Sequence, residues 1–124
     1  MIGPAPEATV VMESARQYTG AAKIALQLCN MNRHLAFAAR AHIDGNCRVI
    51  APQVARYAGL EEIGRMGLLM TIELGPRVRL GVATTDMELI PDVRRDGREM
   101  LDFCRICLKC AENCPSRSIP FDDR

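Results

Sequence analysis

The sequence Cys104-Arg-Ile-Cys107-Leu-Lys-Cys110-Ala-Glu-Asn-Cys114-Pro115 decides how the rest of the chain is interpreted. Its spacing is C-x2-C-x2-C-x3-C-P, the spacing with which bacterial iron–sulfur proteins bind a 4Fe-4S cluster. Thiolates at three-residue steps can surround one cluster within a short stretch of chain. The sequence therefore predicts a 4Fe-4S cluster with Cys104, Cys107 and Cys110 as ligands, and Cys114 as the fourth candidate.

Closely spaced cysteines can also bind structural zinc or form disulfide bonds. A structural zinc site usually pairs two C-x2-C hooks across a longer spacer, which this sequence does not have. Disulfide bonds between cysteines so close in the sequence would be strained in most pairings. An iron–sulfur cluster is therefore favoured over both alternatives.

The composition fits one small folded domain, or a small core with an appended cluster segment. The chain has 124 residues, of which 48% are hydrophobic and only 4% aromatic, so its core must consist mainly of aliphatic side chains. The formal net charge of +1 gives no reason to expect nucleic acid or an anionic membrane as a partner.

The cysteines and the N-terminal sequence together predict a cytoplasmic protein. Thiolate ligands must stay reduced until metal binds them, which favours a reducing compartment. The sequence Met1-Ile-Gly-Pro-Ala-Pro-Glu7 has neither the basic region nor the apolar region of a signal peptide. No apolar run reaches the length that spans a bilayer.

Hydrophobic periodicity predicts a long helix over residues 12–30. Its apolar stripe recurs at three- and four-residue steps and consists of Met12, Ala15, Tyr18, Ala22, Ala25, Leu26 and Cys29. A second helix is predicted from Ala51-Pro52 to Ala58, with Gly59 ending it. The remaining cysteines, Cys29 and Cys47, are expected to be small buried or half-buried residues rather than ligands.

The strand signals are shorter. Residues 38–43 are predicted to form a strand that ends at the turn Asp44-Gly45-Asn46. Residues 68–71 and 77–85 are predicted to pair as a hairpin, because apolar and polar residues alternate in the second of them. A charged connector, 86–97, leads into the cluster loop. Together these elements predict an α+β fold.

Several further stretches, taken in order, carry a resemblance to a known family. They are Ala41-His-Ile-Asp-Gly-Asn46, Arg48-Val-Ile-Ala-Pro-Gln-Val-Ala-Arg56, Ala58-Gly-Leu-Glu-Glu-Ile-Gly-Arg-Met-Gly-Leu-Leu-Met70, Leu74-Gly-Pro-Arg-Val-Arg-Leu80 and Thr84-Thr-Asp86, followed by the cysteine run. In this order they resemble the C-terminal half of corrinoid-dependent reductive dehalogenases and, more distantly, epoxyqueuosine reductases. The resemblance covers nearly the whole chain.

The resemblance implies two parts. Residues 1–90 would form part of a nitroreductase-like α/β domain that binds cobalamin, and residues 91–124 a ferredoxin-type 4Fe-4S segment. The family's long N-terminal part and its second cysteine run are missing, so a chain truncated at both ends is expected, binding cobalamin only with the missing part. Glu61 replaces a glycine usual in the family, and Arg117-Ser118 replaces a Gly-Ala pair.

The resemblance also implies roles for individual residues. In the dehalogenases a tyrosine beneath the corrinoid donates a proton beside a basic residue, which assigns Tyr18 and Arg79 here, with Arg77 as a second candidate for the basic residue. Three glycines, Gly64, Gly67 and Gly75, would line the corrinoid.

Cys114 ligates a second cluster in the family. Here it could complete the first cluster, remain free, or complete a site with a partner.

These inferences give one leading function and two alternatives. The leading hypothesis is the electron-transfer part of a reductive dehalogenase-like oxidoreductase, which takes electrons from a donor such as ferredoxin or flavodoxin and delivers them to a corrinoid. One alternative is a stand-alone ferredoxin-like carrier, or an epoxyqueuosine reductase-like fragment, without catalysis of its own. The other is an interaction remnant in which the cluster only staples the C-terminus. An incomplete domain exposes apolar surface, which predicts self-association or a partner chain.

Overall fold

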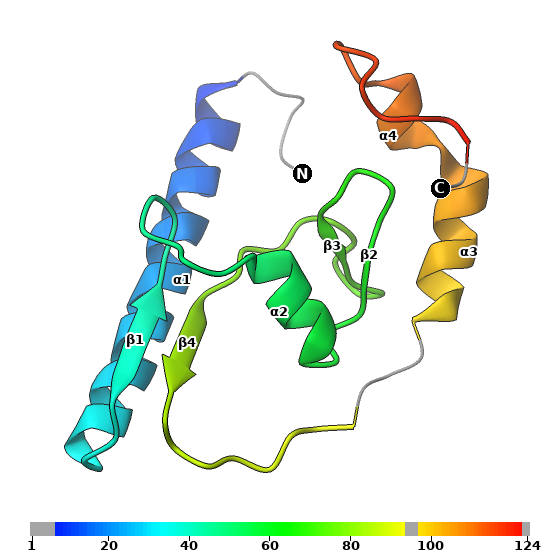
Figure 1. Ribbon diagram of the computed structural model, residues 1–124. Helices are drawn as coiled ribbons and strands as arrows, with labels where there is room; N and C mark the ends of the chain where they lie inside the picture. Colours follow the sequence, from blue (N-terminus) through cyan, green and yellow to red (C-terminus); the bar gives the residue numbers. More distant parts are fainter. Residues whose placement is uncertain (1–6, 94–96, 123–124) are drawn as a thin grey trace. The chain divides into compact units, whose positions relative to one another are not determined.

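The computed structural model describes residues 7–93 and 97–122, which form a mixed α+β structure (Figure 1). The elements in chain order are α1 (Ala8–His34), β1 (Ala39–His42), α2 (Ala51–Tyr57), β2 (Glu62–Ile63), β3 (Leu69–Met70), β4 (Val82–Thr85), α3 (Arg98–Cys107) and α4 (Lys109–Glu112). None of these helices combines the length and apolar character needed to cross a membrane.

The chain divides into two compact units that interleave in the sequence. Unit 1 comprises Met1–Ala51 and Arg79–Leu89, and unit 2 comprises Pro52–Val78 and Ile90–Arg124. The resemblance divides the chain differently, at residue 90, into a corrinoid-binding part and a cluster segment, and that division stays a prediction. The cysteine run and the turn glycines of 64–75 belong to the same unit.

Helix α1 of unit 1 has 27 residues and is longer at both ends than the predicted 12–30. At its C-terminal end Arg33 and His34 occupy the last turn, where positive charge interacts favourably with the helix dipole. The Arg33 guanidinium also donates to the carbonyl of Ala39, with Nη2 at 2.6 Å, which fixes the start of β1 against the helix end.

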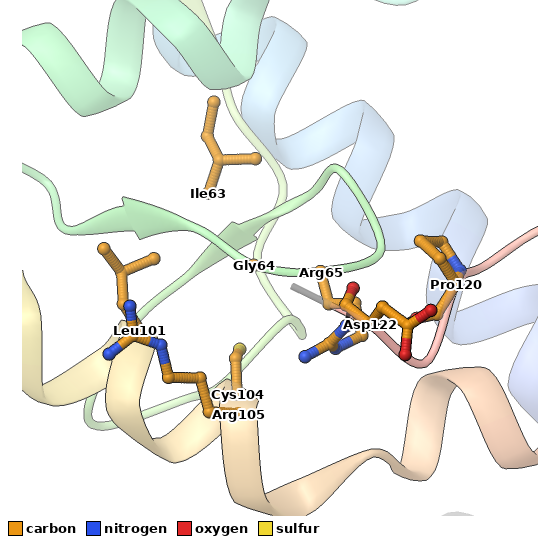
Figure 2. A pocket seen from close by; sticks show the side chains of 8 residues that line it. All are labelled: Ile63, Gly64, Arg65, Leu101, Cys104, Arg105, Pro120 and Asp122. Atoms are coloured by element: carbon orange, nitrogen blue, oxygen red, sulfur yellow. Dashed lines mark hydrogen bonds between the residues drawn. The ribbon is translucent and has the colours of Figure 1, made fainter. Parts of the chain in front are cut away.

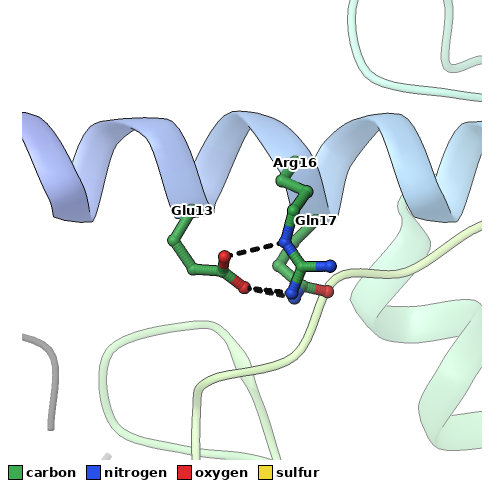
Figure 3. A network of polar contacts seen from close by, with 3 residues as sticks. All are labelled: Glu13, Arg16 and Gln17. Atoms are coloured by element: carbon green, nitrogen blue, oxygen red, sulfur yellow. Dashed lines mark hydrogen bonds and ion pairs between the residues drawn. The ribbon is translucent and has the colours of Figure 1, made fainter.

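A polar network stabilises the exposed N-terminal half of α1 (Figure 3). Arg16 donates from Nε and Nη2 to the two carboxylate oxygens of Glu13, both at 2.8 Å, and the Gln17 amide donates to the same carboxylate. These donors, chiefly Arg16, lower the pKa of Glu13 from 4.5 to about 2. Side chains three and four residues apart are neighbours on a helix surface, so the network needs no tertiary support.

The buried strip on α1 is narrower than the predicted stripe. Ala25, Cys29 and Asn32 are buried, whereas Met12 is 70% exposed and Leu26 is 47% exposed. The reason is that β1 and β4 cover only one side of the helix, where a Cβ added to Gly81 would lie 3.2 Å from the Cβ of Ala25. The prediction for Cys29 is confirmed, but Cys47 is exposed and the prediction of its burial was wrong.

The strand pairing differs from the predicted hairpin. Strand β4 pairs antiparallel with β1, from Ala39↔Thr85 to His42↔Val82, while β3 pairs with β2. Residues 77–81 are not part of a strand. A contact with α1 supports the β1–β4 pairing: Thr85 of β4 donates to the Asn32 side chain of α1 at 3.2 Å.

His42 is part of the core of unit 1. It is 4% exposed, and the backbone N–H of Arg48 donates to its Nδ1 at 3.2 Å. The neutral ring therefore carries its proton on Nε2, which donates to Thr84 Oγ1 at 3.0 Å. Both ring nitrogens are in use, so His42 is a structural residue.

Unit 2 contains an ion pair between a half-buried arginine and a buried glutamate. Arg56, in the last turn of α2, donates to Glu62 at 2.6 Å, and Glu62 is only 5% exposed. Gly97, just before α3, lies so close to Glu62 that any side chain there would collide with it. Gly59 has a φ of +78° directly after α2, as expected for a glycine that ends a helix.

The cysteine run is mostly helical, where the sequence predicted a loop. Cys104 and Cys107 lie in α3, and Cys110 lies in α4. Leu108 separates the two helices with a left-handed φ of +50°. Residues other than glycine are uncommon in this conformation. The turn at Leu108 changes the direction of the chain between Cys107 and Cys110.

Candidate functional site

Three of the predicted ligand cysteines share one cavity of unit 2. The cavity has a volume of about 180 Å³, and Cys104, Cys107 and Cys110 are among the residues that line it. The other lining residues are Arg65, Met66, Met70, Pro76, Phe103, Leu108 and Lys109. Cys104 and Cys107 lie three residues apart and therefore on one face of α3, and the turn at Leu108 brings Cys110 to the same cavity.

The donor set and the lining fit a thiolate-bound cluster. Apolar side chains around sulfur ligands limit solvent access and tune redox potential. Within the described ranges 7–93 and 97–122, no three Cys, His, Asp or Glu side chains already stand as a metal-binding group. The three cysteines line one cavity, and binding a cluster would require their thiols to turn towards one another.

Cys114 is not among the residues that line this cavity. Its sulfur lies 3.4 Å from the Ser116 hydroxyl and 3.7 Å from the Ser118 hydroxyl. Hydrogen bonds from Ser116 and then Ser118 lower the pKa of the Cys114 thiol from 9.0 to about 6. The structure thus brings three of the four predicted ligands together and places the fourth in a separate polar turn.

Lys109 lines the cavity and is paired on α4. Its ammonium group lies 2.9 Å from the Glu112 carboxylate, which raises the pKa of Lys109. The lysine therefore stays charged beside the thiols.

A second pocket, of about 320 Å³, is also lined by Cys104 (Figure 2). Its lining residues are Ile63, Gly64, Arg65, Leu101, Cys104, Arg105, Pro120 and Asp122. Arg65 spans this pocket, because its Nη1 donates to the backbone carbonyls of Pro120, Phe121 and Asp122 at 3.1, 3.0 and 2.7 Å.

The three glycines predicted to line a corrinoid all lie in turns of unit 2. Gly67 and Gly75 have φ values of +80° and +61°, which glycine adopts without strain. Gly64 is different, because it is buried against the Met70 side chain and the Cys104 thiol. The predicted corrinoid contact of all three stays a prediction.

The predicted catalytic pair, Tyr18 and Arg79, is brought together in unit 1. The Arg79 guanidinium carbon lies 4.5 Å from the centre of the Tyr18 ring, and Arg79 Nη2 donates to Ser14 at 3.0 Å. Tyr18 is 43% exposed and so is not a core residue. The pair is a cation–π contact on an accessible surface, and its catalytic role stays a prediction.

Curated relatives identify the family. The tetrachloroethene reductive dehalogenase of Desulfitobacterium hafniense is 39% identical over 104 residues, which are 84% of this chain and 18% of that protein. The chain is homologous to a segment of the reductive dehalogenases. The tetrachloroethene reductive dehalogenase of Sulfurospirillum multivorans is 34% identical over 119 residues, which are 96% of this chain and 23% of that protein. No model of a protein family matches the sequence.

Solved reductive dehalogenase structures contain a segment with a similar fold. The catabolic reductive dehalogenase NpRdhA superimposes with a TM-score of 0.82 at 35% identity, over 90% of this chain and 16% of that protein. One of its structures is a complex with 3-bromo-4-hydroxybenzoic acid. A further reductive dehalogenase structure, equally similar, is described as suggesting a mechanism for B12-dependent dehalogenation.

The matched segment is small. This chain spans about a fifth of the length of the curated reductive dehalogenases it matches, less than the half that the resemblance led us to expect. The comparisons therefore describe the fold of this segment and not the whole length of those enzymes.

Sequence reasoning missed two residues that contact the site. Gly64 was assigned only to a corrinoid, and Arg65 was assigned no role. No periodicity or motif marks them, because both act through contacts with residues about 40 or more positions away, Cys104 for Gly64 and 120–122 for Arg65.

Proposed function

We propose that this chain is the iron–sulfur electron-transfer segment of a reductive dehalogenase-like oxidoreductase. The observation that carries the proposal is the cavity lined by Cys104, Cys107 and Cys110, in a chain homologous to reductive dehalogenases. Residues 91–124 would act as the ferredoxin-type 4Fe-4S segment. The homology favours this function over a stand-alone electron carrier.

The three cavity cysteines would hold the cluster, and Cys114 is the candidate for a fourth ligand, to this cluster or to another. When bound, a 4Fe-4S cluster supplies one-electron transfer. The apolar side chains of Met66, Met70, Phe103 and Leu108 would keep water from the sulfur atoms. The charged Lys109 would offset the negative charge of the ligating thiolates.

The finer part of the proposal concerns a corrinoid. Residues 1–90 would contribute to a nitroreductase-like corrinoid domain together with residues that this segment lacks, with Gly64, Gly67 and Gly75 as its contacts. Tyr18 would donate a proton from its hydroxyl, and Arg79 would hold the ring in place from its face. The similarity to a structure described in terms of B12-dependent dehalogenation supports this part.

The partners follow from the same chemistry. Electrons would come from a low-potential donor such as ferredoxin or flavodoxin. Exposed apolar side chains on α1, such as Val11, Ile24 and Met31, each more than half exposed, support self-association of the isolated chain, which light scattering would show as a size that grows with concentration.

Anaerobic reconstitution with iron and sulfide tests the proposed function. The chain should take up about four iron and four sulfide and turn brown. Cys107→Ser should lose most of this uptake, whereas Cys47→Ser, at an exposed cysteine outside the cavity, should keep it. Equal iron uptake by Cys107→Ser, or stoichiometric binding of zinc in place of iron, would overturn the proposal.

A further inference from the structure

We propose that the β2–β3 turn, residues 64–67, is the positioning element of the thiol cavity. The absence of a side chain at Gly64 leaves space for the Cys104 thiol, and Arg65 hydrogen-bonds the backbone that follows Cys114. The inference rests on the proposed function for the identity of the bound group. The contacts of Gly64 and Arg65 are made between protein residues and do not depend on which group is bound.

Gly64 is required at its position for steric reasons. A Cβ there would lie 2.5 Å from Met70 Cγ and 3.3 Å from both Met70 Sδ and Cys104 Sγ. Met70 is 7% exposed and itself lines the cavity, so it has little space into which it can retreat. Any side chain at Gly64 would therefore push Met70 into the cavity or displace the Cys104 sulfur.

Arg65 holds the chain segment that follows the cysteine run. Its Nη1 donates to three consecutive backbone carbonyls, those of Pro120, Phe121 and Asp122, at 2.7 to 3.1 Å. Figure 2 shows Arg65 with Pro120 and Asp122 around the same pocket. Hydrogen bonds from a charged donor are among the stronger ones in proteins. This segment lies six to eight residues after Cys114 and contains no helix or strand of its own.

Two adjacent residues of one short turn thus contact the first cysteine of the run and the segment that follows the run. Gly64 abuts the first cysteine, and Arg65 anchors the backbone beyond the last. Both line the same pocket as Cys104. A turn that sets the first thiol and restrains the last segment limits how far apart the ligands can move, which is the task of residues that surround a metal site without ligating it.

The rate of iron loss from the reconstituted chain to a chelator tests this inference. Arg65→Met and Gly64→Ala should lose iron about tenfold or more faster than the original chain, the usual range for residues that orient metal ligands. Arg65→Lys keeps the positive charge and places an ammonium donor near these carbonyls, so it should recover part of the loss. Arg105→Met is the matched control, because Arg105 lines the same pocket but pairs with Asp102 at 2.9 Å.

The redox potential and the EPR spectrum of the cluster give a second readout that simple destabilisation would not move. Both should change in Gly64→Ala and stay constant in Gly20→Ala, a substitution in unit 1 where an added Cβ meets nothing within 4 Å. If Gly64→Ala does not fold, the double substitution Gly64→Ala with Met70→Ala removes the closest collision and keeps the approach to Cys104, with Met70→Ala alone as its control. Iron loss and spectra equal to those of the original chain in both the Gly64 and the Arg65 variants would overturn the inference.

Failure of the inference can be told apart from failure of the proposed function. If the original chain binds no iron and sulfide, the proposed function fails. The positioning role of Arg65 is then decided on the metal-free chain by the rate of tryptic cleavage after Arg117. Cleavage should be several-fold faster in Arg65→Met than in Arg105→Met, and equal rates would overturn it.

Discussion

Gly81 lets α1 and β4 approach each other, which predicts that Gly81→Ala destabilises unit 1. A Cβ at Gly81 would lie 2.6 Å from the Ala21 carbonyl oxygen and 3.2 Å from Ala25 Cβ. The carbonyl belongs to the helix backbone and cannot swing aside, so α1 and the start of β4 must separate.

The magnitude follows from two opposing effects. Overfilling a tightly packed contact costs about 1–3 kcal/mol. Replacing glycine by alanine at a position without a positive φ recovers about 0.4–1 kcal/mol, because the unfolded chain loses freedom. We therefore expect the free energy of unfolding to fall by about 1–2 kcal/mol, which lowers the urea midpoint by about 0.5–1 M at the usual slope for small proteins.

Urea unfolding followed by circular dichroism measures this change. Gly20→Ala is the matched control, because a Cβ at Gly20 meets nothing within 4 Å and the residue lies inside α1. It should stabilise the chain by about 0.5–1 kcal/mol through helix propensity. A Gly81→Ala chain as stable as the original, or a destabilised Gly20→Ala chain, would refute the reasoning.

Three further predictions concern single residues. Glu62→Gln should lower the free energy of unfolding, measured in urea, by about 1–2 kcal/mol, because a neutral amide replaces the carboxylate that pairs with the half-buried Arg56. An unchanged midpoint would contradict this. NMR titration should show the Glu13 carboxyl with a pKa of about 2, below its ordinary 4.5, so the network stabilises α1 above pH 4.5 and loses this effect between pH 4.5 and 2. Arg16→Gln should move that midpoint upwards. Arg117→Gly should raise stability by about 0.5–1 kcal/mol, because Arg117 has a φ of +52°, and a fall in the urea midpoint would count against it.

Local patterns predicted the elements that local interactions decide. Strand β1, before its Asp44-Gly45-Asn46 turn, and helix α2, ended by Gly59, lie within a residue or two of their predicted bounds. The pairing of β4 with β1 could not be predicted in the same way. It depends on contacts with a helix about 50 residues away, such as the hydrogen bond between Thr85 and Asn32.

The resemblance was informative where it expected glycine. At the positions of Glu61 and Arg117 the resemblance predicts glycine, and both residues have a positive φ, of +92° and +52°. Glycine adopts a positive φ without strain, so Glu61 and Arg117 hold this backbone conformation at a cost that glycine would avoid.

The candidate site was predicted in composition but not in shape. The cysteine spacing named the three thiols that share the cavity, yet it suggested a loop where α3 and the turn at Leu108 supply the geometry. The resemblance also named Tyr18 and Arg79, which do lie in contact. The role of Gly64 could not be predicted from the sequence, because its close approach to Cys104 is a contact between residues 40 positions apart.

Low-temperature EPR of the reduced, anaerobically reconstituted chain tests the central claim most directly. If Cys104, Cys107 and Cys110 hold a 4Fe-4S cluster, reduction should produce the paramagnetic signal of that cluster, and Cys107→Ser should abolish or alter it. A colourless chain that binds zinc and gives no signal on reduction would contradict the account.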